Sequence, residues 1–181
     1  MNKWICGDSF EELPKIMPKS VQCILTDVPY DLKQDEKEFL HSWFKLICHG
    51  TILVFSPPEN PWIFPADQYL FWIKPISTKN TSKSYSRFVE MIFVYETEKS
   101  IWNYKRHWSQ YTNVFMDLVD DNVIHQYRKP PSLIERLIRN HTNPGDFILD
   151  PFAGSGVVYD VGRRLDREVI AIEKDEKDGR S

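Results

Sequence analysis

Apolar residues are distributed along the chain in two alternating patterns. In the first, a short run is mainly apolar and rich in β-branched or aromatic residues, which is typical of a strand covered on both faces of its sheet. We predict a strand in each of the segments with this pattern: Trp4–Cys6, Val21–Thr26, Thr51–Phe55, Tyr69–Lys74, Val89–Tyr95, Phe147–Asp150 and Val169–Ile172.

In the second pattern, apolar residues recur at helical spacing. The segment Glu36–Ile47 shows this clearly, because Phe39, Leu40, Trp43 and Phe44 fall on one side of a helix. Further helices are predicted at Ser9–Ile16, Ser132–Arg139 and Val157–Leu165. Helices that alternate with strands indicate an α/β fold with a mostly parallel sheet and right-handed crossovers, which residues 1–181 form as one domain.

Residues 96–124 interrupt this alternation. They mix cations with aromatic residues and have no clean periodicity. Cations can pair with phosphates and flat rings can stack on bases, so this composition favours a nucleic-acid surface. The alternative is an excursion whose aromatic residues pack on a small core of their own. On the first interpretation, the residues predicted to contact DNA are Lys99, Lys105, Arg106 and Trp108.

The composition is that of an ordinary globular protein, with 41% hydrophobic and 27% charged residues in a chain of 181. No apolar run is long enough to cross a bilayer, and the first residues do not resemble a secretion signal. We therefore expect a cytoplasmic protein that does not bind membranes. The net charge of -3 gives no overall signature of DNA binding, but a local basic face can bind DNA without one.

Cysteine and histidine spacings argue against a metal site. Cys6, Cys23 and Cys48 form no CxxC pair, and their odd number also argues against a disulfide framework. The five histidines show no HExxH spacing. We predict that the protein binds no metal.

A glycine-rich turn lies between the predicted strand Phe147–Asp150 and the predicted helix Val157–Leu165. Open α/β sheets bind ligands at such strand ends, because glycines permit close approach and a helix N-terminus favours a carboxylate or phosphate. The spacing matches neither the dinucleotide nor the P-loop motif. A purely structural turn is the alternative. The predicted cofactor contacts are Asp150, Pro151, Phe152, Ala153, Gly154, Ser155 and Gly156.

Glu173 ends the next predicted strand, one βαβ unit after the glycine turn. A carboxylate at this position can accept hydrogen bonds from both hydroxyls of a ribose. We therefore predict that Glu173 binds the cofactor.

A second motif, Asp27-Val28-Pro29-Tyr30, follows the predicted strand Val21–Thr26. An amino group on a heteroaromatic ring is a poor nucleophile because its lone pair is delocalised, and two acceptors on its hydrogens would favour a tetrahedral nitrogen. Asp27 can supply one acceptor and the Val28 carbonyl the other, since a residue before proline is held extended. Tyr30 can stack on a base that has been flipped out of its duplex.

These motifs resemble those of the amino-group DNA methyltransferases. Asp27-Val28-Pro29-Tyr30 is similar to their Asp-Pro-Pro-Tyr signature, and Asp150–Gly156 is similar to their cofactor motif. The catalytic motif comes first, as in the circularly permuted beta class, and the resemblance covers nearly the whole chain. It implies a doubly wound, seven-stranded, Rossmann-like methyltransferase fold. It also implies S-adenosylmethionine as cofactor and double-stranded DNA as substrate.

The resemblance assigns further residues. It places Asp8 near the adenine of the cofactor, and it assigns Asp27 and Lys129 to the cofactor site as well. Residues 96–124 lie where the family keeps its target-recognition region. The acidic side chain of Asp27 favours adenine as the target, with the amino group of cytosine as the near alternative. RNA as substrate remains open.

Two departures from the family pattern suggest alternatives. Val28 replaces the first proline of the signature, and the chain stops soon after Glu173, before the helix expected there. A subunit partner could cover the sheet face that this helix would leave open, which suggests a homodimer. The same departures motivate a non-catalytic alternative, in which the methyltransferase fold serves as a DNA-binding or partner subunit.

Overall fold

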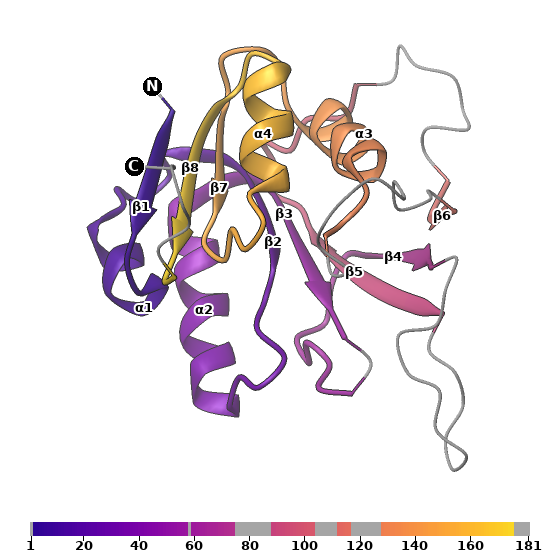
Figure 1. Cartoon of the computed structure of the whole chain (residues 1–181), viewed down its shortest axis with the longest axis horizontal. Coiled ribbons are helices and arrows are strands. Elements are labelled where there is room, and N and C mark those ends of the chain that lie inside the picture. The colour runs from indigo at the N-terminus through magenta and orange to yellow at the C-terminus, as the bar shows by residue number, and fades with distance from the viewer. Residues whose placement is uncertain (1, 58, 75–87, 104–111, 117–127, 176–181) are drawn as a thin grey trace.

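The computed structural model describes residues 2–57, 59–74, 88–103, 112–116 and 128–175 (Figure 1). Its strands are β1 (Lys3–Cys6), β2 (Val21–Asp27), β3 (Cys48–Ser56), β4 (Gln68–Ile73), β5 (Val89–Tyr95), β6 (Val114–Phe115), β7 (Phe147–Asp150) and β8 (Glu168–Glu173). Its α-helices are α1 (Ser9–Glu12), α2 (Gln34–Ile47), α3 (Pro131–His141) and α4 (Val157–Arg164), and a 3-10 helix, η1, follows α1 at Leu13–Lys15. Each predicted strand overlaps one of these strands and each predicted helix overlaps one of these helices, except that the predicted helix Ser9–Ile16 is divided between α1 and η1.

All the strands join one sheet in the order β1-β8-β7-β2-β3-β5-β4-β6. Neighbouring strands run parallel from β1 to β3, whereas β5 is antiparallel to both β3 and β4. The mostly parallel α/β fold is therefore confirmed. Within the described residues the sheet has eight strands where seven were predicted, because β6 adds a short strand parallel to β4. At two residues, β6 is too short to produce a periodic pattern in the sequence.

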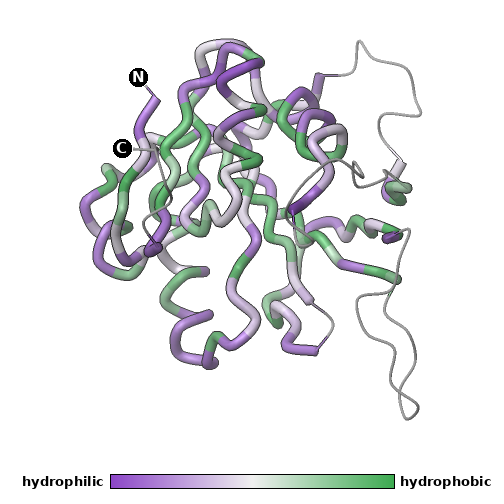
Figure 2. The backbone as a smooth tube through the Cα atoms, in the orientation of Figure 1, coloured by the Kyte–Doolittle hydropathy of each residue, from purple (hydrophilic) through white to green (hydrophobic). Residues whose placement is uncertain are grey.

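Helices cover both faces of the sheet (Figure 1). On one face, α3 and α4 pack on the strands through a buried cluster that includes Leu133, Leu137 and Val161. On the other face, α2 and η1 contribute Leu13, Leu40 and Phe44 to a second cluster. Figure 2 shows apolar stretches along the strands between these two layers. The predicted homodimer, which rests on an uncovered sheet face, stays a prediction.

The order of the strands places a topological switch point at the centre of the sheet. From β7 the chain crosses through α4 to β8 on one side, and from β2 it crosses through α2 to β3 on the other. Because β2 and β7 are parallel neighbours, their carboxyl ends meet at the crevice where such sheets bind ligands. Asp27 ends one of these strands and Asp150 ends the other.

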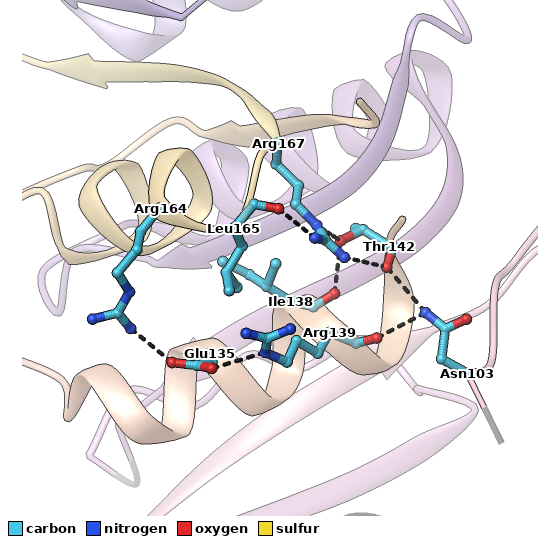
Figure 3. A network of polar contacts seen from close by, with 8 residues as sticks. All are labelled: Asn103, Glu135, Ile138, Arg139, Thr142, Arg164, Leu165 and Arg167. Atoms are coloured by element: carbon cyan, nitrogen blue, oxygen red, sulfur yellow. Dashed lines mark hydrogen bonds and ion pairs between the residues drawn. The ribbon is translucent and has the colours of Figure 1, made fainter. Parts of the chain in front are cut away.

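A polar network fixes the carboxyl end of α3 (Figure 3). Arg167 is buried and donates to the carbonyl and hydroxyl oxygens of Thr142 at 2.7 and 2.9 Å. From the segment after β5, Asn103 Nδ2 donates to the carbonyl oxygens of Arg139 and Thr142 at 2.8 and 3.0 Å. Since these carbonyls belong to the last turn of a helix, the bonds satisfy acceptors that the helix leaves unpaired. The network therefore fixes α3, which begins two residues after Lys129.

Candidate active site

The ends of β2 and β7 are joined by a hydrogen bond. Thr26 Oγ1 donates to Asp150 Oδ1 at 2.9 Å, and the backbone N–H of Phe152 donates to the same oxygen at 3.2 Å. Asp150 is only 2% exposed. Burial raises the pKa of Asp150 to about 7, against the opposing effect of its two hydrogen bonds, and the nearby carboxylates of Asp27 and Glu173 add to the rise.

The glycine turn after β7 has the backbone conformation that its composition predicts. Gly154 and Gly156 have φ angles of +49° and +77°, in the left-handed region that glycine adopts without strain. The N–H of Ala153 donates to the carbonyl of Ile172 at 2.9 Å, and the N–H of Gly154 donates to Glu173 Oε2 at 2.6 Å. These bonds hold the turn against the end of β8.

Glu173 and Asp8 lie close together, at the ends of the neighbouring strands β8 and β1. The N–H of Gly7 donates to the carbonyl of Glu173 at 2.9 Å. Asp8 caps α1 by accepting the N–H of Phe10 at 2.9 Å, and it pairs with Lys174 at 3.1 Å. The Phe10 hydrogen bond and Lys174 both lower the pKa of Asp8, so this carboxylate is charged at neutral pH.

A cavity of about 340 Å³ opens between the ends of β2 and β7. Among the residues predicted for the site, those that line it are Asp27, Lys129, Asp150, Phe152, Ala153, Gly154 and Ser155. Residues that the sequence did not single out complete the lining: Thr26, Phe55, Arg128, Ile134, Val157 and Val158. The lining does not include the other predicted residues Asp8, Val28, Pro29, Tyr30, Pro151, Gly156 and Glu173.

The turn after Asp27 places its side chains in two different environments. Val28 is 2% exposed and belongs to the apolar cluster under α2, so its side chain contributes to the core. Tyr30 is 51% exposed, as a ring that stacks on a base must be. Asn60 Nδ2 donates to the carbonyls of Tyr30 and Leu32 at 2.9 and 3.0 Å, which fixes the course of the turn.

Asp27 has one paired and one unpaired carboxylate oxygen. Lys129 Nζ donates to Oδ2 at 2.6 Å. Oδ1 is shielded from solvent and has no hydrogen-bond partner within the described part of the chain. An unpaired buried acceptor is costly, so its presence in a cavity indicates a place for a donor from a bound molecule. Burial raises the pKa of Asp27 and Lys129 opposes the rise.

Lys129 is held by a second carboxylate that the sequence analysis missed. Glu90 on β5 is 1% exposed, and its Oε1 lies 2.5 Å from Lys129 Nζ. Its other oxygen, Oε2, lies 2.7 Å from Nζ of Lys74. Burial alone would lower the pKa of Lys129, but the carboxylates of Asp27 and Glu90 raise it, so the ammonium stays charged. A lone glutamate in an otherwise apolar strand was the available signal, because a carboxylate is rarely buried without a partner.

Of the four residues predicted to contact DNA, the structure describes Lys99 alone. Lys99 is exposed, and its carbonyl accepts a hydrogen bond from the Gln22 side chain near the start of β2. It therefore lies at the amino end of this strand, opposite the end that carries Asp27. Lys105, Arg106 and Trp108 lie outside the described residues. Thus the structure does not bring Lys99 to the cavity.

Comparison with protein-family models identifies the family to which the chain belongs. The model of the N6/N4 methyltransferases, described as DNA methylase, matches residues 21–178. The chain belongs to this DNA methylase family. It is an S-adenosylmethionine-dependent DNA methyltransferase that acts on amino groups.

Curated relatives match this methyltransferase along most of its length. The type II methyltransferase M2.DpnII of Streptococcus pneumoniae is 25% identical over 233 residues, covering 94% of this chain and 84% of the relative. The DNA adenine methyltransferase YhdJ of Escherichia coli strain K12 is 26% identical over 226 residues, covering 93% and 77%.

Solved structures share its fold. The SAM complex of M1.HpyAVI superposes with a TM-score of 0.76 at 24% identity, over 97% of this chain and 95% of that one. The cytosine-N4-specific PvuII DNA methyltransferase gives a TM-score of 0.71 at 18% identity, over 96% and 82%.

The cavity has features that fit S-adenosylmethionine. Its volume lies in the range of small-ligand pockets, and its lining combines Gly154 and Ser155 of the glycine turn with the acidic residues Asp27 and Asp150. Oδ1 of Asp27 has no hydrogen-bond donor among the described residues, and a bound substrate can supply one. Within the described ranges, no helix is long and apolar enough to span a membrane, and no group of at least three His, Cys, Asp or Glu residues could hold a metal ion.

Proposed function

We propose that this methyltransferase acts on the exocyclic N6 amino group of adenine in double-stranded DNA. The observation that carries the proposal is the unpaired, buried Oδ1 of Asp27 at a cavity wall. An amino group is the donor that this oxygen lacks. The fixed Lys129 contact on Oδ2 leaves Oδ1 as the oxygen that receives the amine.

In this proposal the protein supplies position and electrostatics. S-adenosylmethionine, when bound, supplies a methyl group that its positive sulfonium already activates. Asp27 Oδ1 accepts one hydrogen of the amine and the Val28 carbonyl accepts the other, which concentrates the lone pair on nitrogen. Tyr30 stacks on the flipped base, because its exposed ring stands beside these acceptors in the chain. Catalysis then follows from orientation of the amine and from preorganised polar groups around it.

The proposed cofactor contacts come from the glycine turn and from the two acidic residues that flank it, Glu173 and Asp8. Residues Asp150–Gly156 approach the cofactor through backbone atoms, which their bonds to β8 hold in place. Glu173 and Asp8 are proposed to bind the ribose and adenine, since they flank the turn at the ends of adjacent strands. Glu173 already accepts the N–H of Gly154, so ribose binding would use its remaining lone pairs.

Adenine is favoured over cytosine by two observations. The signature begins with an acid, Asp27, and the family resemblance links this residue to adenine. The Escherichia coli relative is named a DNA adenine methyltransferase. The cytosine-N4-specific PvuII enzyme shares the fold at only 18% identity, so cytosine is the second candidate.

The test is to express the chain in cells that lack other DNA methyltransferases and analyse the nucleosides of their DNA by mass spectrometry. N6-methyladenine is the expected product. N4-methylcytosine instead would overturn the choice of adenine. DNA free of both bases, in cells that contain the folded protein, would overturn the proposed function.

A further inference from the structure

Glu90 is a buried carboxylate on β5, which lies between β3 and β4 in the sheet, and a glutamate in this place needs an explanation. It is 1% exposed, and it lies between two ammonium groups, those of Lys129 and Lys74. Buried ion networks of this kind are weak contributors to stability, because desolvation offsets most of the attraction between charges. A role for Glu90 is therefore better sought in the reaction than in the stability of the fold.

The charged groups form a line that ends at the cavity. Lys74 pairs with Glu90 Oε2, Glu90 Oε1 pairs with Lys129, and Lys129 donates to Asp27 Oδ2. Asp27 Oδ1 is the unpaired end of this line. Because each link occupies one particular oxygen, the line determines which oxygen of Asp27 is left for the substrate.

Aromatic rings confine the ammonium at the centre of the line. Lys129 Nζ lies 5.1 Å from the ring centroid of Phe55 and 5.7 Å from that of Trp72. Cation–π attraction and the two carboxylates together hold Nζ at one place. A fixed Nζ in turn fixes the orientation of the Asp27 carboxylate.

We propose that Glu90 is a positioning residue for methyl transfer, which holds Lys129 between two carboxylates and so keeps Asp27 oriented and strongly accepting towards the target amine. The inference rests on the proposed role of Asp27. With Asp27 as its only partner, Lys129 would neutralise that carboxylate and weaken it as an acceptor. Glu90 shares the positive charge and leaves more negative charge on Asp27 for the amine.

The signs of the neighbouring charges make this inference testable. Around Asp27, the groups are Lys129 before α3, Glu90 on β5, Lys74 after β4 and Asp150 on β7, with Arg128 also lining the cavity. Removing the negative charge of Glu90 should lower the pKa of Asp27. Lys74 partly neutralises the negative charge of Glu90, so removing the positive charge of Lys74 should raise the pKa of Asp27.

The experiment compares Glu90→Gln and Lys74→Met with wild type. Glu135→Gln is the matched control, because Glu135 also pairs with two cations, Arg139 and Arg164, but does not line the cavity. Carbon-13 NMR of the carboxyl groups gives the pKa of Asp27 without cofactor. Incorporation of labelled methyl groups into unmethylated double-stranded DNA gives kcat against pH, and calorimetry gives the affinity for S-adenosylmethionine.

We expect Glu90→Gln to reduce kcat roughly 10–100-fold, as loss of positioning does, with a much smaller change in cofactor affinity. The acid limb of the kcat profile and the pKa of Asp27 should move to lower pH in Glu90→Gln and to higher pH in Lys74→Met. Glu90→Asp, which keeps the charge, should recover part of kcat and leave the limb near its wild-type position. Glu135→Gln should leave both unchanged.

Equal pKa values of Asp27 in wild type, Glu90→Gln and Lys74→Met would overturn the inference. So would a Glu90→Gln variant that is as active as Glu135→Gln. If Glu90→Gln does not fold, the upward shift in Lys74→Met decides the matter alone. An inactive wild type would refute the proposed function, whereas the NMR titration would still test the charge coupling between Glu90 and Asp27.

Discussion

The hydroxyl of Thr26 donates a hydrogen bond to Asp150 Oδ1 at 2.9 Å, and this bond joins the strand that carries the proposed acceptor to the strand that leads into the cofactor turn. The two halves of the site, 124 residues apart in the chain, are thereby held in a fixed relation. Because Asp150 is buried, its protonation state links the site to the stability of the fold.

The first prediction concerns this linkage. Burial raises the pKa of Asp150 to about 7 in the folded protein, above the ordinary value of about 3.8 expected when unfolded. Between these values Asp150 binds more protons in the folded state, so its contribution to the free energy of unfolding is fully present below about pH 3.8 and is lost as pH rises towards and through 7. In Asp150→Asn, the decrease in the free energy of unfolding from pH 5 to 8 should be smaller by about 1 kcal/mol or more than in wild type. Urea unfolding of the cofactor-free protein measures this decrease. The same slope in both proteins would contradict the raised pKa.

The second prediction concerns the ribose site. Glu173→Ala should weaken S-adenosylmethionine binding by roughly 1–3 kcal/mol, the cost of leaving polar groups unpaired. It should also loosen the glycine turn, since Glu173 accepts the N–H of Gly154. Calorimetry of Glu173→Ala beside Glu135→Ala, an acidic control away from the cavity, tests this. Affinity equal to that of the control would remove Glu173 from the site.

The third prediction concerns target recognition. Alanine at Lys105, Arg106 or Trp108 should weaken DNA binding without altering cofactor affinity, and loss of either cation should flatten its salt dependence. Lys99→Ala is the matched control, because Lys99 lies at the opposite edge of the sheet from Asp27. Fluorescence anisotropy with labelled duplex DNA at several salt concentrations measures both effects. DNA affinity as high as that of Lys99→Ala in every variant would show that the segment is ordinary packing.

The fourth prediction concerns Val28. If the backbone carbonyl of residue 28 is the second acceptor, Val28→Pro should preserve methyl transfer and could increase it. Pro29 already favours extended backbone at residue 28, and a compatible proline stabilises by roughly 0.4–1 kcal/mol. Methylation assays together with circular dichroism test this. A folded but inactive Val28→Pro variant would mean that the Val28 N–H makes a bond the site needs. Activity in Val28→Pro but not in wild type would favour the non-catalytic alternative for the natural chain.

The sequence was sufficient to predict most elements of the fold, because the central strands are largely buried on both faces and are mostly apolar. It also singled out Asp27, Asp150 and the glycine turn, which lie at or just after strand ends and contribute to the wall of one cavity. It could not identify β6, whose two residues carry no periodicity. Nor did it show that Lys99 lies far from the cavity, because that depends on the antiparallel direction of β5.

Glu90 shows why the rest of the site needed the structure. Glu90 is far from its partners in the sequence, 63 residues from Asp27 and 39 residues from Lys129, by difference of their numbers. The strand order β2-β3-β5 brings Glu90 near Asp27, and Lys129, just before α3, contacts both. Charge pairing between distant segments leaves no periodic signal, whereas a lone acid in an apolar strand can at least be recognised as a residue that needs a partner.

The central claim is that Asp27 Oδ1 accepts the amine that is methylated. The most direct measurement is the rate of labelled methyl transfer to duplex DNA by Asp27→Ala, with Asp35→Ala on the exposed side of α2 as control and calorimetry to show that the cofactor still binds. The account predicts a loss on the order of 10²-fold or more in Asp27→Ala, as for removal of one preorganised polar group at a reacting centre, and a normal rate in the control. A rate near that of wild type in folded, cofactor-binding Asp27→Ala would contradict it.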